Sequence, residues 1–203
     1  MDLYRKYFSE RDFERIELFL LINRSFEISR VLYPGSYVHI SPSFIFQNVV
    51  YVDSDKKAIK FFKTDLPIKL VEEKKAYKEN PVIRFHPMDY FQDIPEKKES
   101  FDLLISQYAG FVSQACKNYL RTGGILLANN SHGDASMASL DGDFDPAGVI
   151  TGSPQQPKLI VENLEDFFTP KREVDLTREM IEKRKRGIAY KKRAQNFVFR
   201  RVS

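Results

Sequence analysis

The sequence predicts an α/β protein in which helices cover both faces of a mostly parallel central sheet. Short apolar runs rich in β-branched residues recur between residues 30 and 128, and stretches with helical apolar spacing separate them. Strands that alternate with helices form parallel sheets that are buried on both faces. Because crossovers between parallel strands are right-handed, we expect a doubly wound, three-layer sandwich.

The composition is that of a folded protein of 203 residues, 42% of them hydrophobic and 30% charged. Cys116 is the one cysteine, so it forms no internal disulfide, and it favours a reducing compartment. The start of the chain lacks the apolar run of a signal peptide, and no stretch approaches the roughly 20 apolar residues of a membrane span. We therefore expect a cytoplasmic protein with no membrane segment. We also expect a single domain over residues 1–203, with a helical cover over 1–28 and a basic helix and strand over 175–203.

The elements of the N-terminal half follow from spacing and turn residues. A stripe of apolar residues predicts a first helix over Glu10–Asn23, and Ser9–Asp12 resembles a capping box. The run that ends at Pro34 predicts the first strand, and later apolar runs predict the second and third. Ser54 can cap the helix after the second strand, and Pro67–Glu79 is predicted as a further helix. The three strands are Val31–Tyr33, Val49–Val52 and Val82–Phe85.

The C-terminal half continues the same pattern and then weakens. Leu103–Ser106 and Ile125–Ala128 are predicted as the fourth and fifth strands, and the helix between them is expected to stop at Gly123-Gly124. Asp141–Pro157 has the composition of a long loop, with room for a short strand at residues 148–150. The remaining elements are expected to be a helix over Asp175–Gly187 and a terminal strand over Asn196–Val202.

A glycine and a carboxylate stand where an open parallel sheet binds ligands, beyond the carboxyl ends of its strands. Gly35 follows the first strand and allows a ligand to approach the backbone. Asp53 ends the second strand, where a carboxylate can accept two hydrogen bonds from a ribose diol. An ordinary turn at Gly35 and a helix cap at Asp53 are the structural alternatives, although Ser54 or Asp55 could equally provide that cap.

Three segments together resemble class I S-adenosylmethionine-dependent methyltransferases, which have a Rossmann-like fold. They are Val31–Ser36, then Val49–Asp53, then His86–Asp89. The fourth strand, followed by Tyr119–Leu127 with its Leu-x-x-Gly-Gly sequence, is similar to that family's fourth strand, helix and fifth strand. The resemblance covers roughly residues 25–131, and it implies strand order 3-2-1-4-5 with an antiparallel C-terminal strand beside the fifth.

The resemblance implies S-adenosylmethionine as cofactor and assigns roles around it. Gly35 would lie beneath the methionine part, and Asp53 would hold the ribose hydroxyls. Asp89 would face the adenine amino group, with Met88 or Tyr90 on the ring. The remaining residues of the predicted pocket are Tyr33, Ser106 and Gln107, of which Ser106 and Gln107 would line the methyl-transfer site. The acceptor is not identified, and the fourth strand lacks the Asn-Pro-Pro-Tyr type of motif used on exocyclic amines of bases.

The first loop departs from the family pattern. Tyr33 stands where an acidic residue is usual, and Tyr37 and His39 stand where further glycines are usual. Their side chains would crowd the cofactor path, which favours a second hypothesis, a non-catalytic binding or regulatory module with the same fold. A nicotinamide-dependent oxidoreductase is a third hypothesis, and the missing G-x-G-x-x-G sequence counts against it.

Two further groups of residues could carry chemistry. The three histidines, His39, His86 and His132, each follow a predicted strand, but they lack helical ligand spacing, so no metal site is predicted. His132 and Gln107 are the candidate catalytic residues, with His132 as a general base in a polar loop. The basic cluster Lys183–Arg193 is predicted either as a solvated helix face or as a patch that binds RNA.

Overall fold

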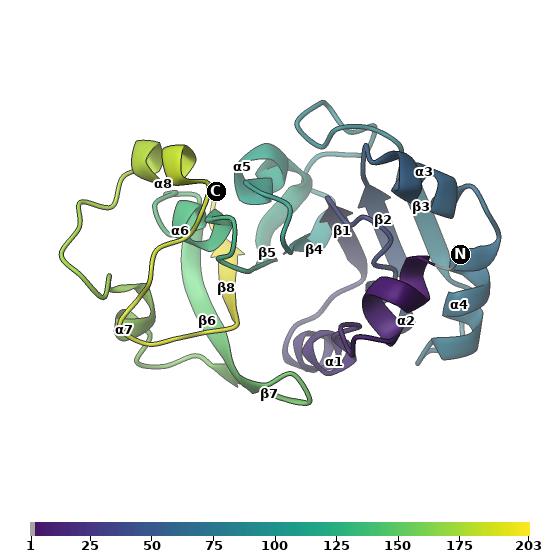
Figure 1. The fold of residues 1–203 in the computed structure, drawn as a ribbon, viewed down its shortest axis with the longest axis horizontal. Coiled ribbons are helices and arrows are strands. Elements are labelled where there is room, and N and C mark those ends of the chain that lie inside the picture. The colour runs from purple at the N-terminus through teal and green to yellow at the C-terminus, as the bar shows by residue number, and fades with distance from the viewer. Residues whose placement is uncertain (1–2) are drawn as a thin grey trace.

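The computed structural model describes residues 3–203 (Figure 1). Met1 and Asp2, the start of the expected N-terminal cover, lie outside the described residues. The strands are β1 (Arg30–Pro34), β2 (Asn48–Val52), β3 (Val82–His86), β4 (Phe101–Ser106), β5 (Leu120–Ala128), β6 (Phe144–Ser153), β7 (Gln156–Ile160) and β8 (Asn196–Arg201). The helices are η1 (Arg5–Ser9), α1 (Ile16–Ser25), α2 (Pro42–Ile45), α3 (Lys56–Phe62), α4 (Leu66–Lys74), α5 (Val112–Cys116), η2 (Lys117–Tyr119), α6 (Asp134–Ala138), α7 (Glu165–Phe168) and α8 (Arg178–Arg184).

All eight strands form one sheet, in the order β3-β2-β1-β4-β5-β8-β6-β7. The first five strands are parallel to one another, with Tyr33 opposite Tyr51 and Tyr51 opposite Phe85. β8 runs antiparallel to β5 and to β6, and β7 is added to β6 as a hairpin. The predicted strand order and the antiparallel terminal strand are confirmed.

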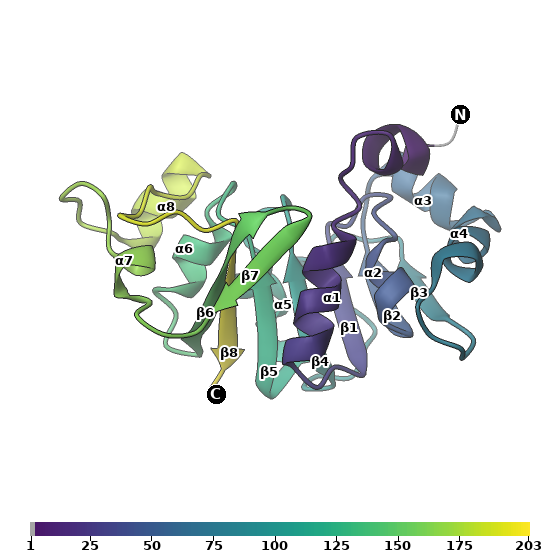
Figure 2. The same ribbon diagram turned by 90° about the horizontal axis from the view of Figure 1, so that it is seen from below.

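Side chains alternate between the two faces of this sheet and build a core on each side. Val31, Tyr33 and Ile105 belong to the core beneath α1, α2, α3 and α4. Leu32 and Leu104 belong to the core beneath α5, α6 and α7. Figure 1 shows α5, α6 and α8 above the strands and α1 below them, and Figure 2 shows α1 in front of β1 and β4. This is the three-layer sandwich that was expected. No helix among residues 3–203 is both long and apolar enough to cross a membrane.

The expected first helix is wrong at its start. α1 begins only at Ile16, because Arg15 adopts a left-handed conformation with φ of 59°. Ser9 does not cap a helix; its hydroxyl donates to the carboxylate of Glu14 at 2.8 Å. The π-helix η1 ends at Ser9, and turn and coil occupy residues 10–15, where the first turns of the helix were expected. This part of the chain folds back over the sheet edge.

Two other elements also differ from the sequence prediction. Gly123 and Gly124 lie inside β5, where Gly123 has φ of 80° and the register against β4 shifts, so the pair forms an irregularity of the strand. The expected loop over Asp141–Pro157 is mostly β6 and the start of β7. A register shift between Pro146 and Gly148 accommodates the turn-type residues within β6.

Candidate functional site

The turn after β1 is held to the end of β2 by Asp53. The backbone N–H of Gly35 donates to the carbonyl of Val52 at 2.8 Å and extends the parallel pairing by one residue. One carboxylate oxygen of Asp53 accepts the N–H of Tyr37 at 2.6 Å, and the other accepts the N–H of Asp55 at 2.7 Å. Asp53 therefore fixes the loop that follows Gly35. Asp55, rather than Ser54, caps α3 with its side chain.

The space directly above Gly35 is filled by the loop that follows β4. Gly35 has φ of 63°, and a Cβ added there would overlap the Cβ of Ala109. The Tyr90 hydroxyl donates to the carbonyl of Ala109 and holds this loop in place. The loop also carries two left-handed residues, Tyr108 and Gly110, with φ of 61° and 97°. In this conformation the loop covers the expected path of the cofactor.

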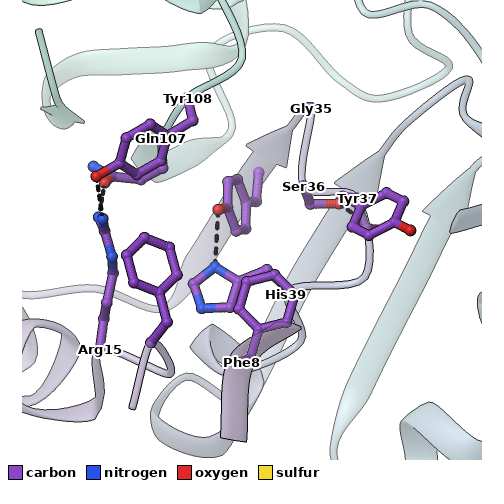
Figure 3. A pocket seen from close by; sticks show the side chains of 10 residues that line it. Phe8, Arg15, Gly35, Ser36, Tyr37, His39, Gln107 and Tyr108 are labelled. Atoms are coloured by element: carbon purple, nitrogen blue, oxygen red, sulfur yellow. Dashed lines mark hydrogen bonds between the residues drawn. The ribbon is translucent and has the colours of Figure 1, made fainter. Parts of the chain in front are cut away.

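A cavity of about 360 Å³ lies beside this closed loop, at the carboxyl ends of β1 and β4 (Figure 3). The segment before α1 forms its other wall. Its lining residues are Phe8, Phe13, Arg15, Tyr33, Gly35, Ser36, Tyr37, His39, Gln107 and Tyr108. Of the six pocket residues predicted from the sequence, this cavity brings together Tyr33, Gly35 and Gln107.

A tyrosine–histidine pair forms one side of the cavity. The Tyr33 hydroxyl lies 2.9 Å from Nδ1 of His39, and Nε2 of His39 lies 3.2 Å from the carbonyl of Glu14. Burial, together with the nearby charge of Arg15, lowers the pKa of His39 to about 3, so the ring is neutral at pH 7. Since the Glu14 carbonyl can only accept, Nε2 carries the proton and Tyr33 donates to Nδ1. Burial also raises the pKa of Tyr33, so both groups are uncharged.

Arg15 forms the opposite side and connects the N-terminal segment to the loop after β4. Figure 3 shows its side chain pointing toward Gln107 and Tyr108. Its guanidinium donates to Oε1 of Gln107 and to the hydroxyl of Tyr108, the latter at 2.7 Å. Gln107 in turn donates to Asn196 at 2.9 Å and accepts from Asn129 at 3.3 Å. Residues from four separate parts of the chain thus fix one wall of the cavity.

Ser106 does not reach this cavity, because it lies on the opposite face of β4 from Ile105. Its hydroxyl donates to the buried carboxylate of Asp134, which also accepts the backbone N–H and the hydroxyl of Ser113 at 3.0 and 2.5 Å. Burial raises the pKa of Asp134 to about 6, although these donors act in the opposite direction. Asp134, at the start of α6, therefore joins the end of β4 to α5, and the cavity is lined by Gln107 and Tyr108, which follow β4.

The other predicted site residues lie outside the cavity. Asp89 is exposed, beyond the end of β3, and its carboxylate accepts the N–H of Phe91 at 3.0 Å. Asp53 borders the cavity through its bond to Tyr37. His132 is exposed, and its Nδ1 lies 3.0 Å from the Ser131 hydroxyl. The assigned roles of these residues remain predictions.

The three histidines do not gather. His39 pairs with Tyr33, and His86 lies 2.9 Å from a carboxylate oxygen of Glu96. Across residues 3–203, no three histidine, cysteine, aspartate or glutamate side chains are grouped as metal ligands. The basic cluster Lys183–Arg193 has its charged side chains exposed, and Lys192 pairs with Asp166 at 3.3 Å.

Sequence reasoning missed Arg15, Tyr108 and the burial of His39. Arg15 lies next to no motif, and it meets Tyr108, the residue after Gln107, only because the chain before α1 folds back across the end of β4. Alternation along the strands does carry a usable signal. Tyr33 and Ile105 share one face, so Gln107, two residues after Ile105, is the residue that continues toward that face.

The strand order and the position of β8 are those of a methyltransferase-like α/β fold. An O-methyltransferase from Bacillus cereus, solved in complex with S-adenosylhomocysteine, is similar with a TM-score of 0.52 at 12% identity. The match covers 94% of this chain and 80% of that one. The O-methyltransferase TomG from Streptomyces achromogenes, solved with S-adenosylmethionine, gives a TM-score of 0.47 at 12% identity over 71% of this chain and 76% of its own.

The YcgJ protein from Bacillus subtilis is 20% identical with a TM-score of 0.42. That match covers 61% of this chain, and this chain spans only 55% of the YcgJ chain. No protein-family model and no curated protein sequence matches the chain. At these sequence identities, the similarity to the solved structures shows the fold alone.

Proposed function

We propose that this chain is an S-adenosylmethionine-dependent methyltransferase that acts on a small-molecule acceptor. One observation carries the proposal: Asp53 lies at the carboxyl end of β2, directly beside the turn at Gly35, in a sheet with the order 3-2-1-4-5. In such sheets, nucleosides bind across the carboxyl ends of the central strands. From this position the carboxylate of Asp53 would hold the ribose diol.

The polar groups at this edge fit the adenosine part of the cofactor. Each carboxylate oxygen of Asp53 accepts one backbone N–H, and a carboxylate oxygen has a second lone pair. Asp53 can therefore still accept from both ribose hydroxyls. Asp89 is exposed near the expected adenine position, with the partly buried Met88 and Tyr90 beside it. When bound, the cofactor would supply an electrophilic methyl group on its sulfonium sulfur.

The methionine part fits only after the loop after β4 has moved. Ala109 occupies the space above Gly35, so cofactor binding requires the Tyr90–Ala109 hydrogen bond to open. Movement here exposes the cofactor path and joins it to the cavity lined by Tyr33 and Gln107. The residues of this chain would then position the acceptor: Arg15 and Gln107 by hydrogen bonding, and the aromatic walls by excluding water.

Calorimetry with S-adenosylhomocysteine tests the proposal. We expect Asp53→Asn to weaken binding about ten- to a hundred-fold, since a hydrogen bond to a charged group contributes roughly 1.5–3 kcal/mol. Asp65→Asn is the matched control, because Asp65 is exposed and its side chain makes no capping bond. Absence of wild-type binding at millimolar ligand would refute the proposal. Equal binding by Asp53→Asn would refute the placement of the ribose.

A second function is favoured by the closed loop itself. If the contact between Ala109 and Gly35 is permanent, the chain is a binding or regulatory module that keeps the fold without the chemistry. The same titration separates the two functions, because a permanently closed loop predicts no binding. NAD and NADP in the same series test the nicotinamide alternative. The expected cytoplasmic location is part of this proposal, and the free, buried thiol of Cys116 is consistent with a reducing compartment.

A further inference from the structure

The cavity beside the Gly35 turn carries a single positive charge. Arg15 is the one charged side chain among its lining residues, because His39 is neutral. Its other polar side chains are those of Tyr33, Ser36, Tyr37, His39, Gln107 and Tyr108. The electrostatics of the cavity therefore favour an anion.

Arg15 has no carboxylate partner among residues 3–203. It is half-buried, its two hydrogen bonds go to the neutral side chains of Gln107 and Tyr108, and its guanidinium stacks on two rings. The guanidinium carbon lies 4.3 Å from the ring centroid of Phe13 and 4.9 Å from that of Tyr108. A guanidinium has five N–H donors, so three remain for a ligand. Charges removed from water are usually paired, and the planar guanidinium matches a carboxylate in a bidentate fashion.

The walls of the cavity suit a flat ring. Phe8 stacks on His39 with ring centroids 4.4 Å apart and planes 8° apart, which presents an aromatic surface opposite the loop after β4. Tyr108 and Phe13 provide aromatic faces on the Arg15 side. The volume of about 360 Å³ is at the lower end of the roughly 300–1,000 Å³ of small-molecule sites. A ligand of one ring with a short substituent is the appropriate size.

A second cavity, of about 290 Å³, lies on the other side of the same stack and shares Phe13, Arg15 and Tyr108. Its lining also includes Asp12, whose carboxylate accepts from Gln155 at 2.7 Å. That cavity therefore contains charges of both signs. An anionic ligand is favoured in the first cavity, because no carboxylate is among the residues that line it beside Arg15.

We propose that the cavity lined by Arg15, Phe8 and His39 binds a small aromatic carboxylic acid. The carboxylate would lie on the free N–H groups of Arg15 and the ring against the Phe8–His39 stack. The role of this acid as methyl acceptor rests on the proposed function, whereas its binding rests on the cavity alone. The site adjoins Gly35, so a ligand there would lie next to the cofactor path.

Calorimetry with benzoate and 4-hydroxybenzoate tests the proposal. We expect both acids to bind the wild-type protein, and benzamide and cyclohexanecarboxylate to bind at least ten-fold more weakly, because each lacks one of the two recognised features. Arg15→Gln should weaken binding of the acids roughly ten- to a hundred-fold. Arg24→Gln, at an exposed position of α1, should bind as the wild type does. Arg15→Lys keeps the positive charge and should retain part of the affinity that Arg15→Gln loses.

Titration of S-adenosylhomocysteine into the same variants separates this inference from the proposed function. Binding of the acids without binding of S-adenosylhomocysteine would leave the cavity assignment standing and refute the methyltransferase. If the acids fail to bind while Arg15→Gln weakens S-adenosylhomocysteine, then Arg15 serves the carboxylate of the cofactor and the inference is overturned. Equal binding of benzoate and benzamide would also overturn it.

Discussion

The hydrogen bond from Tyr90 to Ala109 is expected to hold the cofactor path closed, and Tyr90→Phe removes that bond while keeping the ring. A neutral hydrogen bond contributes a net of about 0.5–1.5 kcal/mol to the conformation that contains it. If the closed loop excludes the cofactor, the apparent affinity is the intrinsic affinity multiplied by the open fraction. Losing the bond then raises the affinity for S-adenosylhomocysteine about two- to twelve-fold.

The same substitution should lower the free energy of unfolding by a similar amount, so the ligand binds more tightly to a less stable protein. Calorimetry gives the affinity, and urea denaturation gives the stability. Tyr77→Phe is the control, because its hydroxyl donates to the carbonyl of Ser43 at 2.8 Å, away from the site. It should lose stability with no change in affinity. Unchanged or weaker binding by Tyr90→Phe would refute the closed-loop argument.

Gly35→Ala should lower the free energy of unfolding by about 2–5 kcal/mol, the sum of left-handed strain and crowding against Ala109. Adding Ala109→Gly should restore the crowding part in urea denaturation, and no rescue would contradict the contact. Because burial raises the pKa of Asp134 to about 6 from roughly 4 in the unfolded chain, the folded state binds the proton more tightly. The stability of the wild type relative to Asp134→Asn should therefore decrease as the pH rises from about 4 to about 6. A difference that stays constant over this range would count against the buried charge. If the cluster Lys183–Arg193 binds RNA, anisotropy titrations should give an affinity that falls steeply with rising salt concentration. Charge reversal at Lys183 and Arg186 should also lower the affinity. No binding at low salt would refute the hypothesis.

Within the parallel half of the sheet, β1, β2 and β4 were predictable because they are buried on both faces. Val49–Val52 is a continuous β-branched and aromatic run, and such runs are recognisable without knowledge of their neighbours. β6 was not predictable, because Asp145-Pro146 and Gly148 have the composition of a loop. These residues are accommodated only by the irregular pairing with β8, which follows them by some fifty residues.

The residues of the candidate site also differ in whether the sequence alone could place them. Gly35 and Asp53 follow strands directly, so their positions at the sheet edge could be derived from the chain order. Arg15 could not be placed, since it meets Gln107 only in the folded protein and its left-handed backbone breaks the expected helix. Ser106 and Gln107 were both assigned to the cavity, but adjacent residues of a strand point to opposite faces, and only one of them can line it.

The position of β8 between β5 and β6 has a consequence for synthesis on the ribosome. β5 and β6 emerge long before their common neighbour, at roughly 5–20 residues per second. Until β8 is made, the nascent chain presents a bare, apolar edge on β5, and such edges pair with other chains. Asn196, the partner of Gln107, arrives on that same late strand. The wall of the cavity can therefore be completed only after β8 has been translated. A chain interrupted before that point would have an unpaired edge on β5 and would lack Asn196 in the cavity wall.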